Sequence, residues 1–535
     1  MARKKIEFDT TDLELSRRRA PLLQRIAASP HGMVATAHYK ATQAGRKILE
    51  ADGNAADAAV AAAFALGVCE PAASGLGGQT MIVYYSAATG KTIALDGSSR
   101  APHRVAPGAM DKDIRLRGHQ ATTVPSTPAV LSYFLSTYGS KSLAEILTPS
   151  IVLAEKGYKV TELQNSLTQR ELKHLKAGSA GKFFLTRGRP YKTGAVFKQP
   201  VLARTLAILA DKGIDEFYYG EIAREIHRDM QENNGLIQDD DLSQIPWPIE
   251  RKPLSCRFRG HRVLTFGEPG AGRTLIEMLK VLDKFPTHLC NPDTPKGALL
   301  LSEIVRRANI DRRDRPFDRN FYPQVQGRHM LKDEYAILVA RQIKSRIKGH
   351  GDTTHLSVMD RQGNAVALTQ SIERVYGSFA ASPNLGFLYN NYMSAFEYED
   401  ITHPNYLRPS AVPWASVAPT MVFRGRKPWL AIGSPGSERI TSAITQVLLR
   451  LENQSPYDAV SAPRLHCSIK GRVSLEAARM RDDIPPFLEK YGFAIDFRDP
   501  YSFYLGCVQL VMVEGGKFIG VADPRRDGTA GGPKK

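Results

Sequence analysis

Cysteine is scarce in this 535-residue chain, and its five cysteines are scattered. None forms a Cys-x-x-Cys pair, so we expect neither a disulfide framework nor a zinc site. Long apolar runs are also missing, because no stretch approaches the ~18 uninterrupted apolar residues that a membrane-spanning helix needs. The opening segment MARKKIEFDTTDLELSRRRAPLL is charged throughout and does not resemble a secretory signal. We therefore expect a cytoplasmic protein with reduced thiols, no membrane partner, no metal and no cofactor.

Acidic residues are outnumbered: Lys and Arg total 72, Asp and Glu total 54, and the formal net charge is +18. Such a surplus can attract nucleic acid or acidic substrates. One basic cluster, residues 306–319, reads RRANIDRRDRPFDR and carries three aspartates between its arginines. This mixture predicts a solvated, partly self-paired helix. Because no nucleic-acid-binding motif accompanies the charge, we expect a basic surface and no nucleic-acid partner.

The pattern of residues along the chain indicates a globular protein of mixed structure. Residues 1–30 are interpreted as an N-terminal arm, and a helix is predicted over about 41–49. Asn54 is a candidate cap for the alanine-rich helix that follows. The runs MIVYYS and TIALDG then predict a β-hairpin. Residues 125–250 are mainly helical in pattern.

The runs THLSVMD and AVALTQS predict a second hairpin, joined by the turn residues RQGN. If the hairpin is centred near Gln362, antiparallel partners have residue numbers that sum to about 724. Thr353 then lies opposite Ser371, so two hydroxyls face each other at one end of the hairpin. The alternative interpretation is an ordinary cross-strand Thr–Ser pair.

A second informative segment is PWLAIGSPGSERITSAITQVLLRL, in which a strand ends near Ile432 and a helix follows the turn. Backbone N–H groups of Gly436 and Ser437 would point outward at the positive end of that helix. Such donors suit an anion or an oxyanion. The alternative is a simple capped turn.

Several longer segments carry a family resemblance: GNAADAAVAAAFALGVCEPAASGLGG, LDGSSRAP, STPAVLSYFLSTYGS, TTHLSVMDRQGNAVALTQSI, YNNYM, APTMVF, GSPGSERI, SAPRLH and ADPRRDG. In this order they resemble the gamma-glutamyltranspeptidase family of N-terminal-nucleophile hydrolases from residue 31 to 530. The resemblance implies an α+β fold, a four-layer αββα sandwich. It also implies a precursor that cuts itself into a large chain, 31–352 behind the arm, and a small chain, 353–535. The two chains would form one catalytic domain as a heterodimer.

The resemblance implies roles for individual residues. Thr353 matches the nucleophile, and the precursor would be cut between Asp352 and Thr353. A threonine hydroxyl needs a base, and a newly freed α-amino group, which titrates near ~8, can serve. Ser371 matches a second hydroxyl residue that supports the nucleophile. Gly436 and Ser437 match the family's oxyanion pair.

The substrate positions depart from the family pattern. Ser98 stands where the family has the arginine that binds the γ-glutamyl α-carboxylate, and Arg100 follows two residues later. Ala395 replaces the aspartate that binds the α-amino group. Ala415 replaces the first of two serines, and only Ser416 remains. Because each lost partner in a desolvated pocket costs about 2–5 kcal/mol, we expect γ-glutamyl amides to be turned over poorly.

Three functions stay open at this point. The first is an autoprocessed amide hydrolase or acyltransferase for a small acyl amide, with Arg100, Glu373 and Ser416 as candidate substrate-binding residues. Glu373 stands where the family has Asn or Glu. The second is a true gamma-glutamyltranspeptidase or glutathione hydrolase. The third is an uncleaved, non-catalytic binding protein.

Overall fold

The structure is a computed structural model. It describes residues 25–534 apart from 112, 315–332, 334 and 337–352. Asp352, on one side of the predicted cleavage, lies outside the described residues, as does most of the predicted N-terminal arm.

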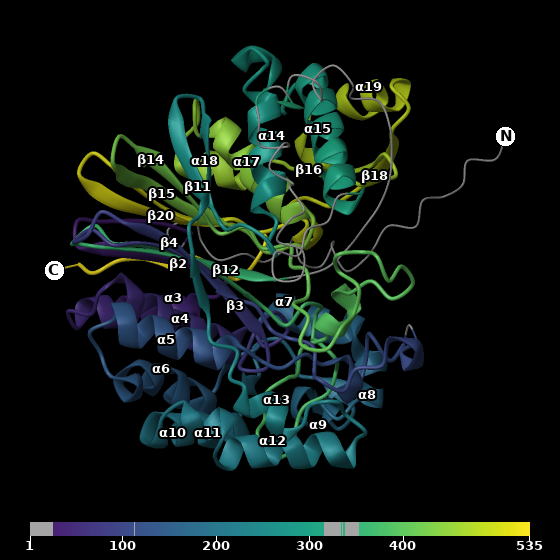
Figure 1. The fold of residues 1–535 in the computed structure, drawn as a ribbon. Helices are drawn as coiled ribbons and strands as arrows, with labels where there is room; N and C mark the ends of the chain where they lie inside the picture. Colours follow the sequence, from purple (N-terminus) through teal and green to yellow (C-terminus); the bar gives the residue numbers. More distant parts are fainter. Residues whose placement is uncertain (1–24, 112, 315–332, 334, 337–352, 535) are drawn as a thin grey trace.

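Two seven-stranded antiparallel sheets form the centre of the molecule (Figure 1). Sheet 1 contains, in spatial order, β1 (Ile26–Ser29), β20 (Lys517–Ala522), β19 (Gln509–Glu514), β15 (Lys427–Gly433), β14 (Thr420–Arg424), β11 (His261–Thr265) and β10 (Leu254–Phe258). Sheet 2 contains β21 (Thr529–Gly531), β2 (Gly32–Thr36), β12 (Thr354–Asp360), β13 (Ala365–Ser371), β3 (Gln79–Tyr85), β4 (Thr92–Gly97) and β9 (Ile249–Arg251).

The two sheets pack face to face, and each is covered by helices on its other side. Strand β13 shows the alternation: Ala365 and Ala367 pack between the sheets, while Val366 and Leu368 pack against the helices. In this strand the small side chains face the other sheet and the larger ones face the helices. Other strands bring larger side chains, such as Met81 and Phe423, into the layer between the sheets. This explains why the central strands read as nearly continuous apolar runs.

Helices from the first half of the chain cover sheet 2 (Figure 1). They are α3 (Tyr39–Glu50), α4 (Ala55–Cys69), α5 (Thr127–Tyr138), α6 (Leu143–Lys156), α7 (Glu162–Arg170), α8 (Leu172–Ala177), α9 (Gly181–Phe184), α10 (Pro200–Lys212), α11 (Asp215–Tyr218), α12 (Glu221–Glu232) and α13 (Asp239–Ser243). The short strand pairs β5 (Tyr158–Lys159) with β8 (Val196–Phe197), and β6 (Leu185–Thr186) with β7 (Arg189–Pro190), lie among them in sequence.

Later helices cover sheet 1: α14 (Gly272–Leu282), α15 (Pro295–Asp314), α17 (Arg439–Arg450), α18 (Pro456–Ser461) and α19 (Ile484–Lys490). A small sheet joins them, made of β16 (Leu465–Cys467), β17 (Arg472–Leu475) and β18 (Ala494–Phe497). Single 3₁₀ turns are η1 (Pro107–Ala109), η2 (His119–Ala121), η3 (Thr287–Leu289), η5 (Tyr392–Ala395), η6 (Ala477–Arg479) and η7 (Phe503–Leu505). The predicted four-layer αββα sandwich is confirmed.

Local sequence signals account for several element boundaries. The Asn54 side chain accepts from two backbone N–H groups at the start of α4, and Asp57 completes a reciprocal capping box. Fourteen residues of α4 are buried, as its small alanine side chains allow. One boundary differs from the expectation: β1 precedes residue 31 and pairs with β20. Its four residues are too few to show a strand pattern in the sequence.

In its described part, residues 306–313 of α15, the arginine-rich segment is more buried than the solvated helix that its composition predicts, although Arg313 is exposed. Arg306 and Arg312 are only 6% and 5% exposed, and Asp311 is 2% exposed. The predicted self-pairing does occur, since Arg307 Nε lies 2.9 Å from Asp311 Oδ2. Burial follows from the neighbours of α15, because it packs against α14, β16 and α19. Those contacts are tertiary and leave no periodic signal in the segment itself.

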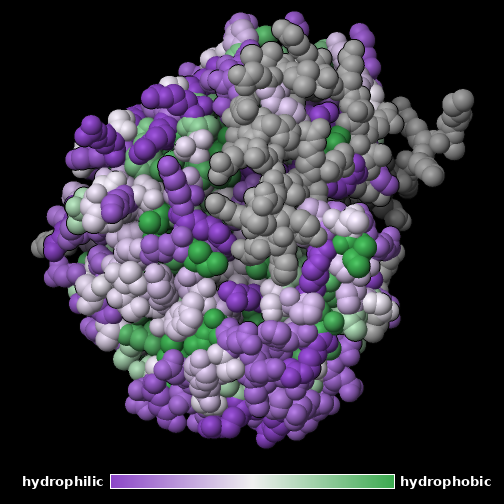
Figure 2. Space-filling model, viewed as in Figure 1, coloured by the Kyte–Doolittle hydropathy of each residue, from purple (hydrophilic) through white to green (hydrophobic). Residues whose placement is uncertain are grey.

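Figure 2 shows a hydrophilic surface along the lower edge and small separate groups of hydrophobic residues above it. Within the described ranges, no helix combines the length and the apolar character needed to cross a membrane. The same ranges contain no group of three or more His, Cys, Asp and Glu side chains that could hold a metal ion.

Candidate active site

The β12–β13 hairpin has the predicted register. Thr354 pairs with Gln370 and His355 with Thr369, so the partner numbers sum to 724. One step further along this register, Thr353 and Ser371 lie at the same end of the hairpin. Thr353 is 3% exposed and Ser371 is 1% exposed. The Ser371 Oγ accepts a hydrogen bond of 2.8 Å from the Glu373 backbone N–H, which orients this hydroxyl.

Tyr392, in η5, is a further polar group beside Ser371. Burial and the charge of Glu373 raise the pKa of Tyr392, while hydrogen bonds with Ser371 and Gln79 act in the opposite direction. The Tyr392 backbone N–H donates to Asn390 Oδ1 over 3.0 Å, which anchors the turn. The role of Tyr392 was not predicted from the sequence, although the segment YNNYM that contains it belongs to the family resemblance.

The start of β12 is fixed from the side by a charged network. Thr354 Oγ1 donates to Glu70 Oε2 over 2.6 Å, and Arg526 binds the other oxygen of the same carboxylate. Glu70 ends α4 and Arg526 comes from the segment ADPRRDG. These two family segments therefore hold the strand that begins directly after Thr353.

His355 brings the second part of the site close to the first. Its ring is buried, with Nδ1 2.8 Å from Thr369 Oγ1 and Nε2 3.1 Å from Ser357 Oγ. Gly433, at the end of β15, packs so closely that a Cβ there would lie 2.3 Å from the His355 ring. Burial lowers the pKa of His355 to about 3, so the ring is neutral. It acts as a spacer between the two sheets.

The turn after β15 presents the predicted oxyanion donors. Gly436 has φ 120° and Ser437 has φ 54°, so both adopt the left-handed region that favours glycine. Neither backbone N–H donates to another residue in the described part of the chain. Ser434 Oγ accepts from the Cys507 N–H over 3.0 Å, and a Cβ on Gly436 would lie 3.0 Å from Gly506 Cα. The turn is therefore braced, with its donors open.

The predicted substrate residue Ser416 lies next to a buried arginine. Arg312, in the last turn of α15, donates from Nη2 to Ser416 Oγ over 3.2 Å and to the Ala415 carbonyl over 3.0 Å. Burial lowers the pKa of Arg312 to about 9, against the opposing charges of Glu438 and Glu373. Ser416 and Glu373 thus meet in one region, and Arg312 and Glu438 join them without having been predicted.

Arg100, the other predicted substrate residue, has a backbone bridge to Val124 and no side-chain hydrogen bond or ion pair within the described ranges. The neighbouring Ser98 hydroxyl donates to Asp96 over 2.6 Å, and Arg251 pairs with the same carboxylate. The Ser98 hydroxyl is therefore engaged by Asp96 of β4, the strand that ends just before it. Arg100 stays a prediction that no contact supports.

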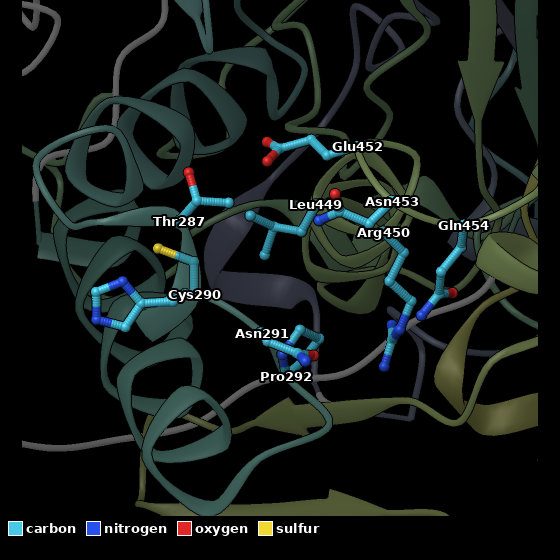
Figure 3. A pocket seen from close by; sticks show the side chains of 10 residues that line it. Thr287, Cys290, Asn291, Pro292, Leu449, Arg450, Glu452, Asn453 and Gln454 are labelled. Carbon is cyan, nitrogen blue, oxygen red and sulfur yellow. The ribbon is translucent and has the colours of Figure 1, made fainter.

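A surface hollow of about 540 Å³ lies away from these residues (Figure 3). Its lining includes Arg450 and Glu452. Both are already paired, Arg450 with Asp293 over 2.6 Å and Glu452 with Arg259 over 3.4 Å. The hollow contains none of the predicted catalytic residues, and we place no ligand in it.

Comparisons with known proteins agree with this geometry. A family model described as gamma-glutamyltranspeptidase matches residues 41–532. The glutathione hydrolase proenzyme of Escherichia coli (strain K12) is 32% identical, over 94% of this chain and 92% of the relative. The acylase ACY 1 proenzyme of Pseudomonas sp. (strain V22) is 32% identical over 82% and 83%. The crystal structure of cephalosporin acylase from Bacillus halodurans has a TM-score of 0.89 at 27% identity, covering 97% of this chain and 99% of that one.

Two antiparallel sheets between two helical layers, with a hydroxyl residue at the start of a central strand, define an N-terminal-nucleophile hydrolase. The chain belongs to the gamma-glutamyltranspeptidase family. It is an amide hydrolase or acyltransferase of that type. The relatives favour an enzyme over the non-catalytic binding protein that the sequence left open.

Proposed function

We propose that this protein cuts its own chain before Thr353 and then hydrolyses or transfers the acyl group of a small amide. The observation that carries the proposal is the hairpin register, in which Thr353 and Ser371 fall at the same end. The turn after β15 supports it, because the backbone N–H groups of Gly436 and Ser437 donate to no other described residue. Two relatives named as proenzymes support the cleavage.

The cleavage step uses the Thr353 hydroxyl. Its oxygen attacks the Asp352 carbonyl carbon, the Asp352–Thr353 C–N bond breaks, and the freed nitrogen takes the hydroxyl proton. Asp352 is then joined to Thr353 Oγ1 as an ester. Water opens this ester to give the Asp352 carboxylate and a free Thr353 hydroxyl with an α-amino group beside it.

Turnover repeats the same chemistry on the substrate. The α-amino group, which titrates near ~8, removes the proton from Thr353 Oγ1 as this oxygen attacks the substrate carbonyl. Backbone N–H groups of Gly436 and Ser437 stabilise the oxyanion. The amine leaves with the proton, and an acyl ester forms on Thr353. Water or an acceptor amine then releases the acyl group.

The acyl group is proposed to be small and to end in a carboxylate. Ser416 and Arg312 offer a hydroxyl and a cation to such a group. Ala395 offers nothing to an α-amino group, which favours a des-amino acyl group such as glutaryl. A second candidate, true γ-glutamyl transfer, is favoured by Glu373 and Glu438, whose carboxylates act on Arg312 and could hold an ammonium group.

Amine release from two anilides tests the proposal and separates the two candidates. The purified, incubated protein is assayed with γ-glutamyl p-nitroanilide and with its des-amino analogue, glutaryl p-nitroanilide. We expect the glutaryl compound to have the higher kcat/KM. A tenfold advantage for the γ-glutamyl compound, or about 1.4 kcal/mol, would select the second candidate. The proposed function would be contradicted if p-nitroaniline were released from neither of these compounds and from no other small acyl anilide.

A further inference from the structure

We propose that Arg312 is the residue that binds the carboxylate at the far end of the acyl group. The inference rests on the proposed function and names a specificity-determining residue for it. Arg312 belongs to the arginine-rich segment that the sequence pattern assigns to solvent, and the structure instead brings it beside Ser416.

The side chain of Arg312 is held rigidly by neutral groups. Nη2 donates to the Ala415 carbonyl and to Ser416 Oγ, and the guanidinium carbon lies 3.3 Å from the ring centre of Trp414. The planar cation is therefore stacked and oriented before a ligand arrives. An oriented guanidinium loses little side-chain entropy when it binds a carboxylate.

Arg312 also lacks a partner for its charge. The side chain is 5% exposed, yet it forms no ion pair with the described residues, and its Nη1 has no hydrogen-bond partner among them. Buried charges in proteins are normally paired or bound to a ligand. Arg312 keeps the hydrogen-bonding capacity and the charge that a substrate carboxylate needs.

The charged neighbours of Arg312 place it beside the reacting groups. The groups that act on it electrostatically are Glu438, Glu373 and Arg273. Glu438 directly follows Ser437, and the Glu373 N–H donates to Ser371 Oγ. Arg273 is paired with Glu268 over 3.6 Å. Arg312 thus lies within electrostatic range of Glu438, which follows the oxyanion turn, and of Glu373, which holds the supporting hydroxyl.

The test compares a carboxylate with its neutral analogue. Glutaryl p-nitroanilide and 4-carbamoylbutanoyl p-nitroanilide have the same shape, but only the first carries a charge. We expect wild-type kcat/KM to favour the glutaryl compound at least tenfold. Arg312→Met should lower kcat/KM about a hundredfold for the glutaryl compound and less than threefold for the carbamoyl compound. Arg312→Lys, which keeps the charge, should fall between wild type and Arg312→Met.

Arg424→Met is the matched control. Arg424 also stacks on a tryptophan, with its guanidinium carbon 3.8 Å from the Trp429 ring centre, but it is exposed at the far end of β14. This variant should keep the wild-type preference. All rates are divided by the fraction of chain that gels show to be cut. If the Arg312→Met chain stays uncut, the inference is tested by the preference of the wild type for the glutaryl compound and by the kcat/KM values of Arg312→Lys.

Equal losses on both anilides in Arg312→Met would show a general structural role and overturn the inference. A wild-type protein that does not prefer the glutaryl compound would overturn it regardless of the variants. If neither anilide is hydrolysed, calorimetric titration with glutaric acid mono-N-methylamide separates the two failures. Binding to wild type that is weakened in Arg312→Lys and lost in Arg312→Met supports the carboxylate site while the proposed reaction fails. No binding to wild type would overturn both.

Discussion

At the scale of single residues, the account depends on two hydroxyls. Thr353 is the proposed nucleophile, and Ser371 is held in place by the Glu373 N–H and lies near the Tyr392 hydroxyl. An oriented hydroxyl can support the nucleophile through a hydrogen bond, which contributes about 1–2 kcal/mol.

Ser371→Ala should therefore slow both self-cleavage and turnover by about tenfold. Ser371→Thr keeps the hydroxyl and should stay within threefold of wild type. Cleavage is followed on denaturing gels over time, and turnover by p-nitroaniline release. An alanine variant as fast as wild type in both reactions would remove Ser371 from the catalytic residues.

The residues of the site differ in how far the sequence predicts them. That Thr353 and Ser371 face each other follows from counting along one hairpin, because a short turn fixes the register, whereas their roles follow from the family resemblance. Arg312 could not be found that way. Its contact with Ser416 joins segments 104 residues apart, and its own segment has the composition of a solvent-exposed helix. A buried arginine is recognisable only when its neighbours are known.

At the scale of elements, the turn between β15 and α17 holds the proposed oxyanion donors. The pattern of a strand, a Gly-Ser-Pro-Gly-Ser turn and an amphipathic helix predicts this unit well. The close packing of Gly433 on His355, which brings the turn to β12, depends on the two sheets meeting and has no local signal.

Substitutions in this turn should separate backbone geometry from side-chain chemistry. Gly436→Ala would strain a residue at φ 120° and press a Cβ to 3.0 Å from Gly506 Cα, so we expect kcat to fall about a hundredfold. Ser437→Gly relieves a left-handed serine and should keep activity within threefold. Gly425→Ala is the control, because Gly425 has φ 62° with open space around it. Full activity in Gly436→Ala would place the oxyanion site elsewhere.

The spacer His355 should make stability depend on pH. Burial holds its folded pKa at about 3, below the ordinary value of 6.5, so protons bind first to the unfolded chain as pH falls. The contribution of His355 to the free energy of unfolding is fully present above pH ~6.5 and declines below it. At pH 5 it is smaller by about 2 kcal/mol. The comparison uses the Thr353→Ala variant, whose chain is expected to stay uncut. Between pH 8 and pH 5, the urea midpoint of unfolding should fall less steeply when this variant also carries His355→Gln than when it keeps His355. Identical slopes would contradict the buried, neutral ring.

At the scale of the whole molecule, the proposed cut divides both sheets between two chains. In sheet 2, β12 and β13 would belong to the small chain and lie between β2 and β3 of the large chain. In sheet 1, β14 of the small chain pairs with β11 of the large one. The layer order was predictable from the family resemblance. This interleaving depends on strand pairing far along the chain, which no single segment encodes.

The two chains should therefore stay together after cleavage. We expect size-exclusion chromatography of the cut protein to give one peak that contains both chains, which separate only in denaturant. Elution of a free 183-residue chain (535 minus 352) under native conditions would contradict the interleaved arrangement.

The central claim is that Thr353 is both the site of self-cleavage and the nucleophile. Intact-mass analysis and N-terminal sequencing of the incubated wild-type protein, beside Thr353→Ala, test it most directly. The account predicts a wild-type small chain that begins Thr-Thr-His-Leu-Ser and an alanine variant that stays one inactive 59.0 kDa chain. An active wild-type protein that remains uncut, or an alanine variant cut at the same bond, would contradict it.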